Sequence, residues 1–246
     1  MHMKKRYIAL IIIIFIVFLG AVYLLLNNKQ TMEIGNENII DAKNGQIYQL
    51  NFERQGVIFS QGNSYTAEAY YPITQSDEVN TQIQEELTSR VNSFIVEEQA
   101  LSLVASENNR NYLKINYIVK NYSSDIKSYI FTLNSYSGGS YSDTDIISMI
   151  FNLETGKQYV FEDIITDKDA LEVALAENIK LQLEERREEI DEGMIAGGID
   201  DYVFSLESGA INFYFAPLTV APYADGMLIV SFELSNLEDI LTDDFK

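Results

Sequence analysis

Residues 126–159 read IKSYIFTLNSYSGGSYSDTDIISMIFNLETGKQY, and this stretch decides the fold class. Its first run places Tyr129, Phe131 and Leu133 on one face of an extended chain, because side chains alternate between the two faces of a strand. Near its end, Gly156 in ETGK predicts a tight turn, since glycine readily adopts a positive φ. The stretch therefore predicts long β-strands joined by turns.

The pair Gly138-Gly139 interrupts a run rich in tyrosine and serine, so it suggests a phosphate cradle, a ligand loop or a hairpin tip. Phosphate cradles lead into a helix N-terminus and often carry a lysine. Here no helical pattern and no adjacent lysine follow, and the region is acidic, which disfavours phosphate. Tyr136 and Tyr141 flank the pair, so the four residues form a candidate turn or recognition surface, with core packing of the tyrosines as the alternative.

Helical patterns lie on both sides of this stretch. An apolar residue recurs every four positions in each: Val79, Ile83, Leu87 and Val91 upstream, and Leu171, Leu175, Ile179 and Leu183 downstream. β-rich runs precede, separate and follow the two helices. This order predicts an α+β fold, with an antiparallel-rich sheet or sheets and two amphipathic helices packed on one face.

The N-terminus carries an apolar segment, Tyr7 to Leu26, of 20 residues without a charge. That length spans a hydrocarbon core of roughly 30 Å as a helix. Lys4, Lys5 and Arg6 precede it, so the positive-inside rule predicts a cytoplasmic tail over 1–6, a single-pass anchor over 7–26 and an extracytoplasmic remainder. A cleaved signal peptide is the alternative, although its apolar region would be shorter and followed by a small-residue site. Residues 27–44 are polar and predict a stalk.

The remainder is strongly acidic. Without Lys4, Lys5 and Arg6 it has 14 basic against 37 acidic residues, a net charge of −23. This balance disfavours nucleic acid and anionic membrane surfaces and favours cationic partners, with solubility as the alternative reason. The chain has no cysteine, which excludes disulfides, thiolate catalysis and cysteine-ligated metals. Its one histidine is His2.

Residues 129–165 and 209–241 resemble a bacterial domain of unknown function, number 3298. The residues that match its motifs are Asn152, Thr155, Gly156 and Lys157 in a strand and turn, and Pro222, Tyr223, Ala224 and Gly226 before the last strand. Residues 67–87 resemble its partner domain, number 4163, through Tyr71, Pro72 and Asn80. The resemblance implies two α+β halves, 45–122 and 123–246, and makes Gly138-Gly139 the bend between two long strands.

This domain pair occurs in the anti-sigma factor RsiV, which binds lysozyme, and in peptidoglycan deacetylase C. The resemblance therefore implies a membrane-anchored protein that faces the cell wall. Only residues 1–6 precede the apolar segment, so we expect no direct anti-sigma activity. No histidine follows His2, so we expect no metal-dependent deacetylation. Where the family pattern has Ala-His-Gly, this chain has Ser140-Tyr141-Ser142, which would remove any ligand role of that histidine.

The residues predict no catalytic site, metal site or cofactor. Carboxylate pairs such as Glu162/Asp163 and Asp200/Asp201 are adjacent in sequence, and neighbours on a strand point to opposite faces. The oxygen-rich turns at 140–145 and 223–226 lack the ligand spacing of a calcium loop. We therefore expect a non-enzymatic binding domain for a cell-wall glycan or a cationic, lysozyme-type protein. The alternatives are a regulatory subunit acting through a separate membrane partner and, less favoured, a carboxylate-based wall hydrolase.

Overall fold

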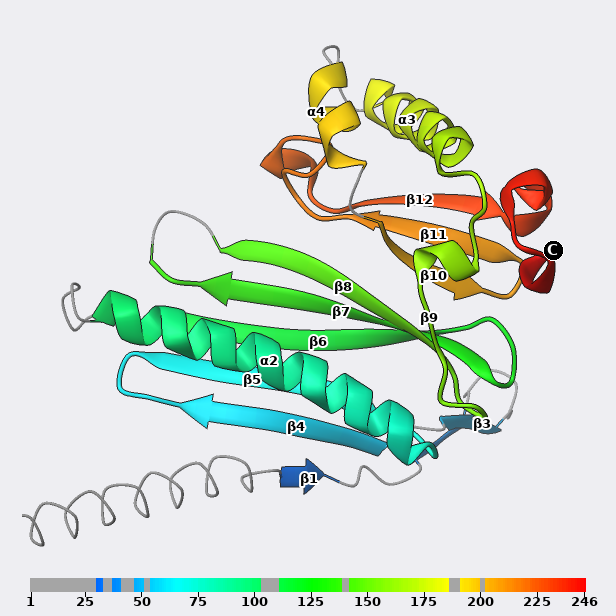
Figure 1. The fold of residues 1–246 in the computed structure, drawn as a ribbon. Coiled ribbons are helices and arrows are strands. Elements are labelled where there is room, and N and C mark those ends of the chain that lie inside the picture. Colours follow the sequence, from blue (N-terminus) through cyan, green and yellow to red (C-terminus); the bar gives the residue numbers. More distant parts are fainter. Residues whose placement is uncertain are drawn as a thin grey trace, which may run out of the picture.

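A computed structural model describes residues 30–32, 37–40, 47–50, 54–102, 111–138, 142–185, 191–199 and 202–246. These residues form a seven-stranded sheet, a three-stranded sheet and a two-stranded pair (Figure 1). The two-stranded pair joins β2 (Glu37–Ile40) and β3 (Ile47–Leu50). The fold is thus α+β, as predicted.

The seven-stranded sheet has the strand order β1-β4-β5-β6-β7-β8-β9. Its strands are β1 (Gln30–Met32), β4 (Arg54–Gln61), β5 (Tyr65–Ile73), β6 (Asn111–Asn121), β7 (Ile126–Tyr136), β8 (Asp143–Asn152) and β9 (Gln158–Tyr159). Only β5 and β6 pair in parallel, and the helix α2 (Asp77–Ser102) connects them. All other neighbours are antiparallel. Short connections, as antiparallel pairing allows, join β4 to β5, β6 to β7 and β8 to β9.

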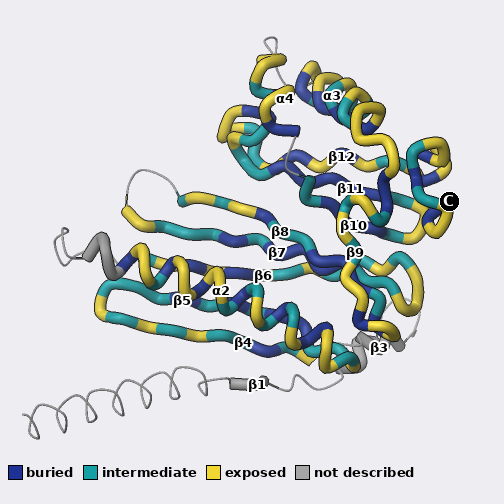
Figure 2. Tube along the Cα trace, viewed as in Figure 1, coloured by how far each residue is buried: buried dark blue, intermediate teal, exposed yellow. Residues whose placement is uncertain are grey.

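Helix α2 covers one face of the seven-stranded sheet, and its apolar stripe is buried as predicted (Figure 2). Val79, Ile83, Leu87 and Val91 are at most 2% exposed. They pack against alternate residues of the central strands, including Ile115, Tyr129, Phe131 and Phe151. The apolar residues that recur every four positions on the helix and every two positions on the strands therefore pack together in one apolar layer.

The three-stranded sheet contains β10 (Val203–Glu207), β11 (Ala210–Phe215) and β12 (Leu228–Glu233). Helices α3 (Lys168–Glu184) and α4 (Glu192–Gly198) lie over it (Figure 1). Short 3-10 helices complete this part: η1 (Phe161–Asp163), η2 (Tyr223–Asp225), η3 (Leu234–Asn236), η4 (Glu238–Ile240) and η5 (Asp243–Phe245). The predicted stripe of α3 is buried in this second core.

The two sheets meet where β10 crosses the face opposite α2. Alternation on β7 sends Tyr129 toward α2 and Ser128 toward β10. The Ser128 hydroxyl donates to the Leu206 carbonyl at 3.2 Å and accepts from the Leu206 N–H at 2.9 Å. The prediction that both helices pack on one face is therefore wrong, because each sheet has an apolar face of its own to cover.

The predicted anchor over 7–26 lies outside the described residues. Within the ranges that the structure does describe, no helix has both the length and the apolar character needed to cross a membrane. In the segment predicted as a stalk, residues 30–32 form β1 and pair with β4. The seven-stranded sheet continues from β6 to β7 across the predicted boundary at 122/123.

Candidate functional site

The predicted glycine turn follows β7. The Tyr136 ring stacks on Tyr112, its partner across β6, with centroids 6.0 Å apart and planes 21° apart. Gly138 has a φ of 91°, a conformation that suits glycine. Gly139 and Tyr141 lie outside the described residues. The described part therefore places the half-buried Tyr136 beside the exposed Tyr112 at one end of the sheet.

The upstream motif residues have structural partners. Asn80 is 9% exposed, and its Oδ1 accepts from the Thr74 N–H at 2.7 Å and hydroxyl at 2.9 Å. Its Nδ2 donates to the Thr74 carbonyl at 3.0 Å, which fixes the entry to α2. Tyr71 is 2% exposed beside Gly56, and burial raises the pKa of its phenol. Pro72 lies next to it in β5. All three side chains are buried in the fold.

The turn after β8 is held by its own side chains. Asn152 Oδ1 accepts from the backbone N–H groups of Glu154 at 3.0 Å and Thr155 at 2.9 Å. Gly156 has a φ of 73°, which confirms the predicted turn. Lys157 Nζ donates to Asp163 at 2.9 Å, so this motif links the turn to η1.

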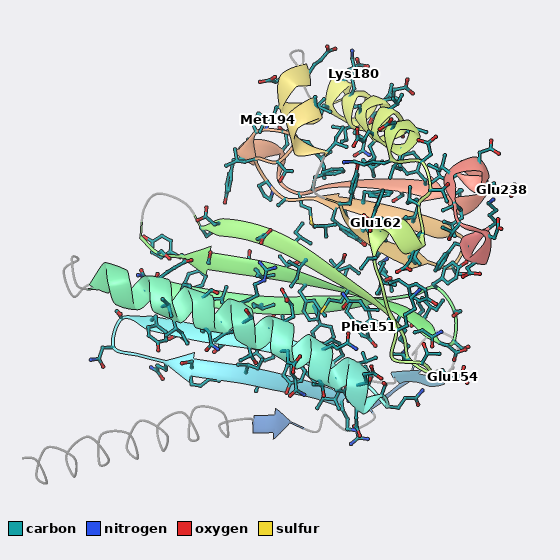
Figure 3. The ribbon with its side chains drawn as sticks, viewed as in Figure 1. Phe151, Glu154, Glu162, Lys180, Met194 and Glu238 are labelled. Atoms are coloured by element: carbon teal, nitrogen blue, oxygen red, sulfur yellow. The ribbon has the colours of Figure 1, made fainter. Side chains whose placement is uncertain are left out.

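Asp163 caps the start of η1. Its carboxylate accepts from the Val160 N–H at 2.9 Å and from Lys157. These two hydrogen bonds, the backbone one first, lower the pKa of its carboxyl group. Its neighbour Glu162 is exposed on η1 (Figure 3). Over the described ranges, no group of three or more acidic, histidine or cysteine side chains is placed to hold a metal ion.

The final motif lies beside the start of β8. Tyr223 is 41% exposed, and its hydroxyl donates to the Ser142 carbonyl at 3.4 Å. Gly226 ends η2 with a φ of 69°, which explains glycine there, and Pro222 precedes η2. The fold thus brings the final motif and the end of the glycine turn together, although they are 81 residues apart.

A groove of about 670 Å³ runs along β8, between α2 and the start of β10. It was not predicted, because its residues form no motif in the sequence. Its lining residues come from four segments: Gln82, Glu85, Glu86 and Arg90 of α2, Asp145 to Met149 of β8, Gln158 of β9, and Tyr202 with Val203. The wall formed by α2 is polar, whereas Tyr202 and Val203 form an aromatic and aliphatic wall on the opposite side.

The groove carries a net negative charge. Glu85, Glu86 and Asp145 face one cation, Arg90, which gives a formal charge of −2. Arg90 Nε lies 2.8 Å from Glu86, and its Nη1 lies 4.0 Å from Asp145. For the exposed Glu85 the described residues provide no ion pair. The groove therefore offers unneutralised carboxylate charge beside an open strand.

An open face of the seven-stranded sheet forms a second candidate surface. It lies on β4 to β6, on the side away from α2, and carries exposed Phe59, Tyr112 and Ile118. A hollow of about 430 Å³ includes Tyr70 and Lys114. The tyrosine pair of Tyr112 and Tyr136 lies at one end of this open face.

Comparison with known proteins identifies one part of the chain. Residues 162–235 match the family described as "Protein of unknown function (DUF3298)". The chain carries a DUF3298 domain. The predicted resemblance to domain 3298 is therefore confirmed over these residues, and the resemblance to domain 4163 stays a prediction. None of the curated proteins matches the chain.

Two solved structures described as DUF3298 family proteins resemble this chain. One from Pseudomonas aeruginosa PAO1 has a TM-score of 0.58 at 12% identity, covering 79% of this chain and 97% of that one. One from Bacteroides fragilis NCTC 9343 has a TM-score of 0.49 at 16% identity, covering 88% and 94%. At 12% identity the first likeness shows a shared fold alone.

The DUF3298 domain supplies only one wall of the groove. The match contains Tyr202 and Val203, whereas α2 and β8 precede residue 162. The acidic wall and the strand edge are thus outside the matched domain. The groove is a junction between the DUF3298 domain and the preceding sheet.

Proposed function

We propose that this protein is a membrane-anchored, extracytoplasmic, non-enzymatic binding domain for a cationic, wall-active protein of lysozyme type. The observation that carries the proposal is the groove along β8, whose formal charge is −2. The net charge of −23 on the sequence after Arg6 adds a field of the same sign. Complementary charge speeds encounter and excludes anionic partners. The resemblance to the lysozyme-binding domain pair of RsiV supports the same class of ligand.

A cell-wall glycan is the second candidate ligand, favoured by the open tyrosine face. Tyr112 is 40% exposed and stacks on Tyr136, and Phe59 is 40% exposed on the same side of the sheet. Aromatic rings offer broad apolar faces at low entropic cost, which suits sugar rings. This ligand would occupy β4 to β6, away from the groove.

The test is a pull-down of the full chain at low salt with immobilised lysozyme and, separately, with insoluble peptidoglycan. The proposal expects retention on lysozyme that decreases as salt is added, because exposed charges are screened. Retention on peptidoglycan alone would replace the proposal with the glycan candidate. Retention on neither would contradict both.

A charge reversal in the groove makes the test specific. Glu85→Lys changes the exposed groove carboxylate, and we expect lysozyme affinity to fall at least about tenfold. Glu97→Lys is the matched control, because it makes the same change on the same helix outside the groove. Equal losses in the two variants would mean that net charge, not the groove, attracts the ligand.

A further inference from the structure

The outer edge of β8 is open over most of its length. The two-residue strand β9 pairs only with Ile150 and Phe151. No other described strand pairs with that edge from Asp143 to Met149. At about 3.3 Å per residue, this open edge is about 23 Å long.

The backbone groups on this edge can be assigned from the ladder. Asn152 donates its N–H outward to the Lys157 carbonyl. Because successive residues of a strand point their N–H and C=O groups to opposite sides, Thr144, Ile146 and Ser148 also point outward. The Ile146 N–H bonds to the Asp145 carboxylate at 2.8 Å, as expected for a donor without a partner strand.

The groove places two different walls beside this edge. On the α2 side, a neighbouring strand would meet Glu85 and Glu86. On the β10 side, it would meet Tyr202 and Val203. An extended chain in the groove would therefore present alternate side chains to an acidic wall and to an apolar one.

We infer that the groove binds an extended basic segment of a partner protein as an added antiparallel strand on β8. This inference rests on the proposed function and specifies how that site would bind. Residues opposite Thr144, Ile146 and Ser148 would exchange about six hydrogen bonds with β8. Residues on the other face of the added strand would place lysine or arginine beside Glu85 and Glu86.

The antiparallel direction and the basic partner follow from the surroundings. β9 already pairs antiparallel with the same edge, so an added antiparallel strand would continue its line. A second copy pairing through its own β8 would bring Asp143, Asp145 and the carboxylates of α2 toward their equivalents. Like charges facing one another are destabilising, so this acidic edge disfavours self-association and favours a cationic strand.

The probe is a capped peptide that alternates lysine and valine over about eight residues, titrated into the full chain. In an antiparallel strand, the residues bonded to Thr144, Ile146 and Ser148 share their face, which points toward β10. These positions are the valines. N-methylation of the valine amides should therefore abolish binding, whereas N-methylation of the lysine amides should be tolerated. A glutamate-valine peptide should not bind.

Variants of the edge complete the test. Thr144→Pro removes one outward N–H without breaking the ladder to β7, and it should weaken the lysine-valine peptide at least about tenfold. Thr144→Val keeps the N–H and should bind like the natural chain. A thermal unfolding curve for each variant shows whether it is folded. If the Thr144→Pro protein is folded, and neither this substitution nor N-methylation of the peptide's valine amides lowers the affinity, strand addition is overturned.

The outcomes separate this inference from the proposed function. If lysozyme is retained but neither Thr144→Pro nor valine N-methylation changes peptide affinity, binding by strand addition is wrong and the proposed lysozyme-type ligand stands. If the peptide binds as expected but lysozyme does not, the strand mode stands and the ligand class is wrong. A concentration-dependent dimer that Thr144→Pro abolishes would assign the edge to a second copy and overturn the inference.

Discussion

Asn80 illustrates how the motif residues act at the scale of single side chains. Its side-chain amide forms three hydrogen bonds with Thr74, which lies three residues before α2 begins: two with the backbone and one with the hydroxyl. Such a buried amide stabilises an entry that the helix itself cannot hold. Asn80 thus has a structural role, whereas in the sequence it stood out only through the resemblance to domain 4163.

We predict that Asn80→Ala lowers the free energy of unfolding by about 2–3 kcal/mol, because Thr74 loses its buried partners. Asn92→Ala is the matched control on the exposed face of the same helix and should change stability by less than about 0.5 kcal/mol. Urea denaturation of both variants measures the difference. A similar small change in both would show that the Asn80 network contributes nothing.

Asp163 predicts a dependence of stability on pH. Its hydrogen bonds lower the carboxyl pKa below the ordinary value of 3.8, so the unfolded chain takes up the proton first as pH falls. The contribution is full above about pH 4 and is lost as pH falls through the folded pKa. Asp163→Ala should therefore cost about 1 kcal/mol at pH 7, with a difference that narrows below pH 4.

The measurement for Asp163 is a series of denaturation curves of both proteins between pH 2.5 and 7. Asp169→Ala serves as the control, since Asp169 is an exposed acidic residue in the first turn of α3. A constant gap between the natural chain and Asp163→Ala across this range would contradict the capping role.

At the scale of elements, the junction of the sheets depends on serine. β10 is an edge strand, and edge strands leave backbone groups unpaired. Ser128 is fully buried and serves both backbone groups of Leu206, and the Ser148 hydroxyl accepts from the Phe204 N–H at 3.3 Å. Hydroxyls on β7 and β8 thus complete the edge of the second sheet.

We predict that Ser128→Ala destabilises the protein by about 1–3 kcal/mol, because it leaves both Leu206 groups buried without a partner. Ser93→Ala, on the exposed face of α2, is the control and should be nearly neutral. Hydrogen exchange at Leu206 should also become faster in Ser128→Ala alone. Unchanged exchange there would mean that the serine does not hold the junction.

The elements could be predicted from the sequence where a period is regular. The stripes of α2 and α3 recur every four residues, and the β7–β8 stretch has alternating faces and a glycine turn, so all were predicted correctly. The second sheet was not separated from the first, because Ser128 and Ser148 look like ordinary strand residues. The groove was also missed, since Glu85, Asp145 and Tyr202 meet only through tertiary structure.

At the scale of the whole molecule, the arrangement of the two sheets leaves β8 between α2 and the beginning of the three-stranded sheet (Figure 1). The strand is paired on one side and open on the other for most of its length. Because the helix wall is acidic and the strand wall is apolar, this edge favours an added strand whose side chains alternate between basic and apolar. This combination distinguishes the groove from the open tyrosine face on β4 to β6.

The most direct test of this account is hydrogen–deuterium exchange of the full chain with and without saturating lysozyme. The account predicts slower exchange in the segments containing Thr144, Ile146 and Ser148 and along the groove face of α2, with little change on β4 and β5. Protection confined to β4, β5 and β6, or no protection at saturating lysozyme, would contradict it.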